Sequence, residues 1–150
     1  MEEYRHTATD PCHISVGGVA YQENNGEIKV VILGRNESDG VHYHLPKGTL
    51  HHNETLEDCA RREVLEESGY SCSVGALLST DTHSYQARDG VAVEKTLIYF
   101  EMPILENRNE HDSEHDLVEC VEIHEAIEKL QQTEPKKKEF LVLERFLERH

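Results

Sequence analysis

Three glutamates in one short stretch are the residues of this sequence best suited to chemistry. Glu63, Glu66 and Glu67 stand at positions i, i+3 and i+4, so a helix would place them on one side. Like charges at this spacing repel by about 0.2–0.5 kcal/mol per pair on an exposed helix, and by more when they are half-buried. We therefore expect a positive partner, and Mg²⁺ or Mn²⁺ is the cation that carboxylate oxygens suit.

The helix that must carry these glutamates has clear start and stop signals. Thr55, with Asp58 three residues later, is typical of an N-cap with its capping-box partner. Gly69 supplies the left-handed conformation that often ends a helix. These signals predict a helix over about residues 56–67. Its apolar residues would face a core: Leu56, Ala60 and Val64.

A solvated acidic helix face is the alternative interpretation of three glutamates alone. The longer spacing favours a functional motif: Gly48, five residues, Glu54, seven residues, and then the run Arg62–Tyr70 (REVLEESGY). This stretch resembles the Nudix box in every fixed position, with one soft departure at Tyr70, where that family usually has an aliphatic residue. The preceding His44–Gly48 segment (HLPKG) also resembles the lead-in of the family.

The Nudix resemblance implies an α/β fold, an α/β/α sandwich with a mixed sheet, in one domain over residues 1–150. It also implies a Mg²⁺-dependent pyrophosphohydrolase that cuts a nucleoside diphosphate linked to another group. Arg62 would orient the metal ligands, and Glu54 would be a structural acid behind them. The metal ligands would be the carbonyl of Gly48 and the carboxylates of Glu63, Glu66 and Glu67.

Residues outside the box bear on the substrate. Tyr85 stands sixteen residues after Gly69, where members that cleave dinucleoside polyphosphates tend to carry a tyrosine that could stack on a base; a half-exposed strand tyrosine is the alternative. Lys47 and Lys95 are candidate phosphate contacts, although Lys47 could equally be a solvated loop lysine. Glu114 is a candidate general base, with a solvated loop acid as the alternative. The HLPKG segment also resembles the diadenosine tetraphosphate group of the family.

Two further clusters have simpler interpretations. The histidines around the box fit no zinc spacing, so we expect exposed loop residues at His42, His44, His51 and His52. The run Lys136–Lys138 is expected to be a solvated helix start, with a phosphate-binding patch as the alternative.

Composition limits the remaining function classes. The 150 residues suit one domain, and the formal charge of −15 argues against general nucleic-acid or membrane-surface binding. No apolar run is long enough for a membrane span, and the N-terminus has no signal-peptide shape, so a cytoplasmic location is expected. The cysteines form no CxxC pair and are expected to be reduced: Cys12, Cys59, Cys72 and Cys120.

Hydrophobic patterning predicts the remaining elements. Residues 1–11 are expected to be a loose or edge segment, and Gly17–Gly18 within the first strand indicates a close approach of backbone or ligand. Pro103 is expected to end a strand, and Pro135 to lie in the first turn of a C-terminal helix. The expected strands are 13–22, 28–34, 71–80, 91–102 and 117–123, with polar loops at 35–42 and 106–116, a turn at 87–90 and a short helix at 124–132.

Three functional hypotheses fit these sequence features. The first is an enzyme that hydrolyses a dinucleoside polyphosphate or a related nucleotide as its small-molecule substrate. The second is a module that senses a nucleotide without cleaving it, although such modules tend to lose box glutamates and this chain retains them. The third is a hydrolase of another pool: oxidised nucleoside triphosphates, ADP-ribose, capped RNA ends or inositol pyrophosphates. The acidic charge disfavours the last two.

Overall fold

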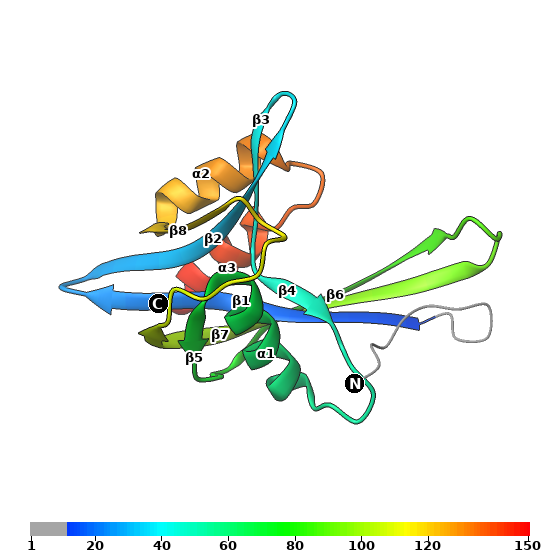
Figure 1. Cartoon of the computed structure of the whole chain (residues 1–150), viewed down its shortest axis with the longest axis horizontal. Helices are drawn as coiled ribbons and strands as arrows, with labels where there is room; N and C mark the ends of the chain where they lie inside the picture. The colour runs from blue at the N-terminus through cyan, green and yellow to red at the C-terminus, as the bar shows by residue number, and fades with distance from the viewer. Residues whose placement is uncertain (1–11) are drawn as a thin grey trace.

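The computed structural model describes residues 12–150, so the segment expected to be loose at 1–11 lies outside the described residues. Strands and helices alternate irregularly along the chain (Figure 1). Their bounds are β1 (Cys12–Asn24), β2 (Glu27–Glu37), β3 (Gly40–His44), β4 (Lys47–Thr49), α1 (Leu56–Ser68), β5 (Tyr70–Cys72), β6 (Leu77–Gln86), β7 (Ala92–Asn107), β8 (Leu117–Glu122), α2 (Ile123–Thr133) and α3 (Phe140–Arg149).

The strands form a mixed sheet. Its central pair, β1 and β7, is parallel, and the other pairings are antiparallel. The main path runs β3-β2-β1-β7-β5, while β4 pairs with β1, β6 with β7 and β8 with β2. The mixed sheet expected from the sequence is therefore confirmed.

Alternate residues of the central strands pack into two separate cores. On β2, Val31 faces a core with Ala60 and Val64 of α1, whereas Ile32 faces a core with residues of α2 and α3. Helix α1 thus covers one face of the sheet and the other two helices cover the opposite face (Figure 1). Because strand side chains alternate between faces, this packing is the predicted α/β/α sandwich.

The predicted caps of helix α1 are present. The Thr55 side chain accepts a hydrogen bond from the Asp58 N–H at 3.1 Å. At the other end Gly69 adopts φ = 81° and its N–H donates to the Leu65 carbonyl. Local signals therefore fix the start and the end of the helix that carries the glutamates.

The close approach predicted at Gly17–Gly18 is also confirmed. A Cβ at Gly17 would lie 2.0 Å from the Pro46 carbonyl oxygen, so only glycine fits there. The Gly18 N–H donates to the same carbonyl at 3.3 Å. The segment that begins the box therefore runs antiparallel beside β1 and packs against Gly17, and this contact sets the position of Lys47.

One expected loop and one expected strand differ in the structure. Residues 35–42, expected to be a polar loop, extend β2 and form β3 as a hairpin in which Arg35 pairs with His42. Its polar side chains gave no apolar alternation to detect. The expected strand at 71–80 is two strands, β5 and β6, which pair with different parts of β7.

Two proline-based expectations are also wrong. Strand β7 continues through Pro103 to Asn107; Pro103 occupies the last pair between β1 and β7, where a missing N–H costs least. Helix α3 begins at Phe140, so Pro135 lies in a preceding turn and not in the first turn of a helix.

The β6–β7 hairpin reaches beyond the body of the sandwich, with its turn at the predicted residues 87–90 (Figure 1).

Within residues 12–150 no helix combines the length and apolar character of a membrane span. Cys59, Cys72 and Cys120 are free thiols, as expected.

Candidate active site

Arg62 organises the side chains of the box. Its Nε and Nη2 donate to the two carboxylate oxygens of Glu54 at 2.7 and 2.9 Å. Its Nη1 donates to Glu63 at 2.6 Å and more weakly to Glu66 at 3.4 Å. The hydrogen bonds from Arg62 hold the pKa of Glu54 at about 2. The guanidinium thus ties the loop before α1 to the carboxylates of the helix.

Glu63 lies against the box glycine. The carboxylate is buried, and a Cβ at Gly48 would meet its Oε2 at 2.0 Å, so a larger residue at position 48 would displace it. Burial raises the pKa of Glu63, even though Arg62 and its hydrogen bond lower it. The close packing brings the backbone of Gly48 and the Glu63 carboxylate to one place.

Glu67 is the most perturbed carboxylate of the site. It is 7% exposed and accepts a hydrogen bond from the Lys47 N–H at 2.8 Å. Burial raises its pKa to about 8, and the neighbouring charges of Glu63, Glu114 and Asp112 add to this effect. Glu66, in contrast, has a side chain that is 53% exposed. A cation beside Glu67 would relieve both the desolvation and the repulsion.

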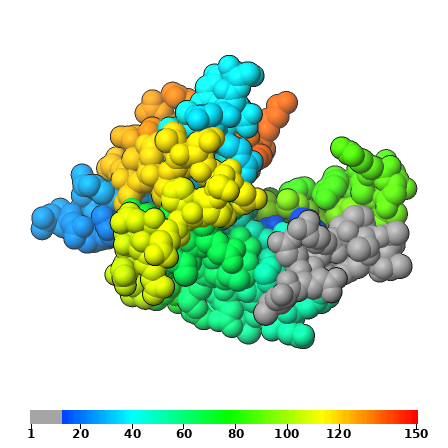
Figure 2. Space-filling model, in the orientation of Figure 1, coloured from blue at the N-terminus to red at the C-terminus, as the bar shows by residue number. Residues whose placement is uncertain are grey.

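The loop after β7 is attached to the end of helix α1. The Asp112 N–H donates to the Glu66 carbonyl at 2.7 Å, and the Arg108 N–H donates to the Gly69 carbonyl at 2.8 Å. Figure 2 shows this loop on the surface between α1 and the β2–β3 hairpin. The segment expected to be a charged loop is therefore fixed over the box, where it positions Glu114.

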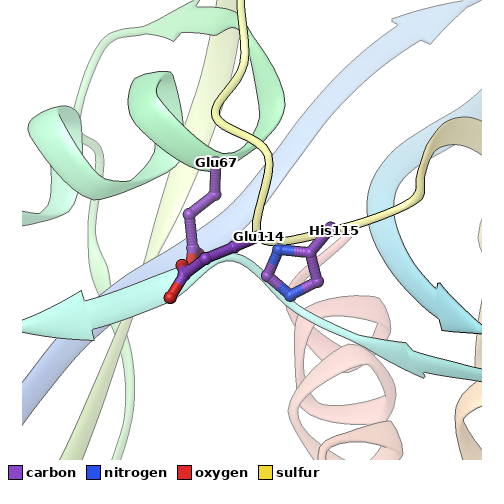
Figure 3. A group of neighbouring side chains, drawn as sticks. All are labelled: Glu67, Glu114 and His115. Atoms are coloured by element: carbon purple, nitrogen blue, oxygen red, sulfur yellow. The ribbon is translucent and has the colours of Figure 1, made fainter.

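Glu114 joins Glu67 in a small cluster that includes His115 (Figure 3). One ligand atom from each of the three residues lies within 4.8 Å of the others. Two carboxylates and an imidazole are a donor set that fits a divalent cation. His115 was not anticipated from the sequence, where the only signal was its position beside an acid just before a strand.

Lys47 is paired with a buried acid that the sequence did not indicate. Its Nζ lies 3.0 Å from Oε2 of Glu139, which also accepts from the Tyr99 hydroxyl at 2.6 Å and from the Leu45 N–H at 3.1 Å. Burial opposes ionisation of Glu139, but Lys47 and the hydrogen bonds more than offset it, so the pKa lies below its ordinary value. Lys47 is therefore not a simple solvated lysine, and its phosphate contact stays a prediction.

A hollow of about 470 Å³ is lined in part by Lys47. We call it the lysine hollow, after the cationic residues that line it: Lys47, Lys95 and Lys136–Lys138. Burial lowers the pKa of Lys95, and the charges of Lys47 and Lys137 lower it further. The lysine run, interpreted as a solvated helix start, is exposed but lies in the turn before α3, where Lys138 adopts φ = 58°.

Tyr85 lies on β6, in the outer part of the β6–β7 hairpin that also carries Lys95. It pairs with Val93 and is 44% exposed. His83, two residues earlier, pairs with Lys95 and lines the lysine hollow. Because strand residues two apart share a face, Tyr85 lies next along from the hollow. The structure does not bring it to the carboxylates.

The expectation of exposed histidines is wrong at three of the four positions. His44 is buried, and burial lowers its pKa to about 4. His42 is half-buried, with its Nδ1 2.9 Å from Glu134. His51 is partly buried, and His52 is exposed as expected. The β2–β3 hairpin, which the sequence did not reveal, accounts for the burial of the first two.

Comparison with known proteins gives a consistent result. A family model described as NUDIX domain matches residues 11–143. A NUDIX hydrolase from Nitrosomonas europaea is similar in structure, with 18% identity, a TM-score of 0.69, and coverage of 91% of this chain and 88% of that chain. An Ap4A hydrolase from C. elegans, in a binary complex, gives 20% identity, a TM-score of 0.62, and coverage of 91% and 96%.

A further similar structure is the NUDIX domain of NrtR from Shewanella oneidensis, complexed with ADP ribose, at 15% identity and a TM-score of 0.68, with coverage of 91% of this chain and 86% of that chain. No curated protein matches the chain significantly. The structural similarities, at these identities, concern the fold. The family model covers most of the sequence, including the whole box, and the chain therefore belongs to the Nudix family.

Proposed function

We propose that this protein hydrolyses a phosphoanhydride bond of a dinucleoside polyphosphate, with diadenosine tetraphosphate as the representative substrate, in a reaction that requires Mg²⁺ or Mn²⁺. The observation that carries the proposal is the adjacency of two opposite charge clusters. The hollow formed by Gly48, Glu67, Glu114 and His115 and the lysine hollow are both lined by Lys47 and Lys137. A polyphosphate chain could therefore meet metal ions at one end and ammonium groups at the other.

The carboxylates of the box would hold the cation. A bound divalent cation neutralises phosphate charge and lowers the pKa of a bound water. The residues assigned to it are the Gly48 carbonyl and the side chains of Glu63, Glu66 and Glu67. Arg62 acts by keeping Glu63 and Glu66 in place through its hydrogen bonds.

Glu114 is assigned the general base. Its carboxylate is exposed, and it lies in the same cluster as Glu67. In the proposed step, the Glu114 carboxylate takes a proton from water as the water oxygen attacks phosphorus. The bond between that phosphorus and the bridging oxygen breaks, and the departing phosphate keeps the electron pair. Positioning and charge stabilisation supply most of the catalysis in such reactions.

The lysines and Tyr85 are assigned to the substrate. Lys47 and Lys95 would contact phosphates, with Lys136–Lys138 extending the same surface. Tyr85, farther along the hairpin face, would stack on a base. The length of the basic surface favours a long polyphosphate with two nucleosides over a short substrate such as ADP-ribose.

A nucleotide screen with product chromatography tests the proposal. We expect diadenosine tetraphosphate to be cleaved faster than nucleoside triphosphates, oxidised triphosphates or ADP-ribose, and we expect excess chelator to abolish turnover until Mg²⁺ or Mn²⁺ is added. Preference for ADP-ribose over every dinucleotide would contradict the substrate assignment. Unchanged hydrolysis in chelator would contradict the metal mechanism, and binding without turnover would indicate a sensing module.

A further inference from the structure

The imidazole of His115 is buried without full hydrogen bonding. The residue is 7% exposed, and its Nδ1 has no hydrogen-bond partner among the residues that the structure describes. Its ring lies 6.1 Å from that of His44, a contact that satisfies no polar atom. Leaving a buried polar atom unpaired destabilises a fold. Such an atom in a native fold needs an explanation, and a bound ion or water supplies one.

The surroundings of His115 identify what that group is. A ring nitrogen lies within 4.8 Å of carboxylate oxygens of Glu67 and Glu114, and Figure 3 shows the two carboxylates together beside the imidazole. Ligand atoms on opposite sides of one cation, at metal–ligand distances of about 2.0–2.6 Å, are themselves about 4–5 Å apart. The three side chains thus span the space of one ion.

The backbone around the cluster is already fixed. The Arg35 Nε donates to the Glu114 carbonyl at 3.2 Å, and the Asp116 N–H donates to the Gly34 carbonyl at 2.9 Å. These bonds flank His115 on both sides in the chain and hold the loop against β2. The backbone that carries the buried imidazole is therefore held in place before any ion binds, as the support of a metal ligand should be.

We propose that His115 is a nitrogen ligand of a divalent cation that it shares with Glu67 and Glu114. The inference rests on the proposed function, where Glu67 is assigned to the catalytic metal and Glu114 to the general base; one carboxylate oxygen of Glu114 would face this cation and the other the attacking water. An imidazole favours first-row transition metals, whereas carboxylates alone suit Mg²⁺ equally well. The mixed donor set makes this position selective for Mn²⁺ over Mg²⁺, and His115 is the residue that sets the selectivity.

Electron spin resonance on the full chain tests the assignment directly. Mn²⁺ is titrated into the metal-free protein, and electron spin-echo modulation is recorded to detect a nitrogen nucleus bound to the ion. We expect ¹⁴N modulation in the wild type that changes to the ¹⁵N pattern when only histidine is labelled with ¹⁵N. This labelling experiment needs no substitution, so it does not depend on the folding of a variant.

Two matched variants locate the nitrogen. His115→Phe should lose the modulation and bind Mn²⁺ at least about 10-fold more weakly, whereas its Mg²⁺ affinity should fall less. His44→Phe alters the neighbouring buried ring outside the cluster and should keep the modulation. Modulation that is retained in His115→Phe would overturn the proposal.

The outcomes separate this inference from the proposed function. If the wild type cleaves its substrate with Mg²⁺ or Mn²⁺ but bound Mn²⁺ shows no histidine nitrogen, the His115 ligand is refuted and the hydrolase remains. If no divalent cation binds at all, both the ligand and the metal mechanism fail.

Discussion

The two hollows that meet at Lys47 are built in opposite ways. The carboxylate side is crowded and held by Arg62, by the buried Glu63 and by backbone hydrogen bonds from a docked loop. The lysine side combines an exposed turn, Lys136–Lys138, with a half-buried Lys95 on an extended hairpin. The carboxylate side holds most of its charges by burial and hydrogen bonds, and the lysine side presents most of its charges on an exposed turn.

Under the proposed function, this difference assigns catalysis to the carboxylate side and substrate binding to the lysine side. Burial, together with the neighbouring carboxylates, raises the pKa of Glu67, and a cation would reverse this shift, so the carboxylate side suits the ion assigned to it under the proposed function. Ammonium groups on long side chains adapt to phosphates at several positions. Substitutions on the two sides should therefore change different quantities: turnover on the carboxylate side, and substrate preference on the lysine side.

The largest effect is expected for the glutamates. Glu66→Gln or Glu67→Gln keeps the shape of the side chain but removes its charge, so kcat should fall by on the order of 10³-fold or more. Folding, followed by thermal unfolding, should be intact or slightly improved because repulsion is relieved.

Glu57→Gln on the exposed part of the same helix is the matched control and should behave like the wild type. A Glu66 or Glu67 variant that unfolds, or that turns over at nearly the wild-type rate, would mean that the replaced side chain is structural.

Tyr85→Ala should have a smaller effect that depends on the substrate. Stacking on one base is worth about 1–3 kcal/mol in single-strand binders, which corresponds to a loss of about 5–150-fold in kcat/KM on diadenosine tetraphosphate. A nucleoside triphosphate, with one base, should lose less, and Tyr85→Phe should retain activity on both. Equal losses on the two substrates would point to a packing defect and refute the stacking role.

Lys137→Gln should raise KM for the tetraphosphate about 10-fold, the change expected from losing about 1.4 kcal/mol of binding, while kcat changes little. Steady-state kinetics at two salt concentrations measures this, since the contact should matter less at high salt. Lys29→Gln, which removes a partly exposed lysine of β2 that lines neither hollow, is the control. A fall in kcat with unchanged KM would show that Lys137 does not contribute to substrate binding.

The smallest effect concerns pH and the metal-free fold. Glu67 has a pKa raised to about 8 from an ordinary 4.5, so the folded state retains a proton that the unfolded state releases. The stability from this proton is fully present below about pH 4.5 and is lost as pH rises through 8.

Thermal unfolding in chelator at pH 6 and pH 8.5 measures this loss. Glu67→Gln should remove part of it, by about 1 kcal/mol or more, and added Mn²⁺ should restore the wild type at the higher pH. An identical pH dependence in the wild type and the variant would show that Glu67 ionises normally.

Local features of this fold were predictable from the sequence and distant ones were not. The ends of α1 follow from Thr55 and Gly69, which act within one helical turn, and the close approach at Gly17 follows from its missing side chain. The meeting of Glu67 with His115 depends on how a polar loop hydrogen-bonds to carbonyls at a helix end. Every residue except proline can make such backbone hydrogen bonds, so they leave no recognisable pattern in the sequence.

Two further cases have the same cause. Glu139 is an acid beside three lysines in the sequence, a context typical of solvent, yet the packing of α3 buries it under Lys47. Proline usually interrupts a strand, but Pro103 is tolerated because it lies at the last pair of the parallel β1–β7 ladder. In each case the tertiary position of a residue outweighs the preference of its type.

The hydrogen bond from the Asp112 amide to the Glu66 carbonyl makes the docked loop observable by isotope exchange. When the loop lifts from α1, this amide becomes accessible to solvent deuterium while the helix beneath stays folded, so its exchange rate reports a local opening and not global unfolding. An ion held between Glu67 on the helix and Glu114 on the loop would slow that opening. The exchange rate of this one amide proton would therefore report how the loop docks on α1, and measuring it requires no substitution in the site.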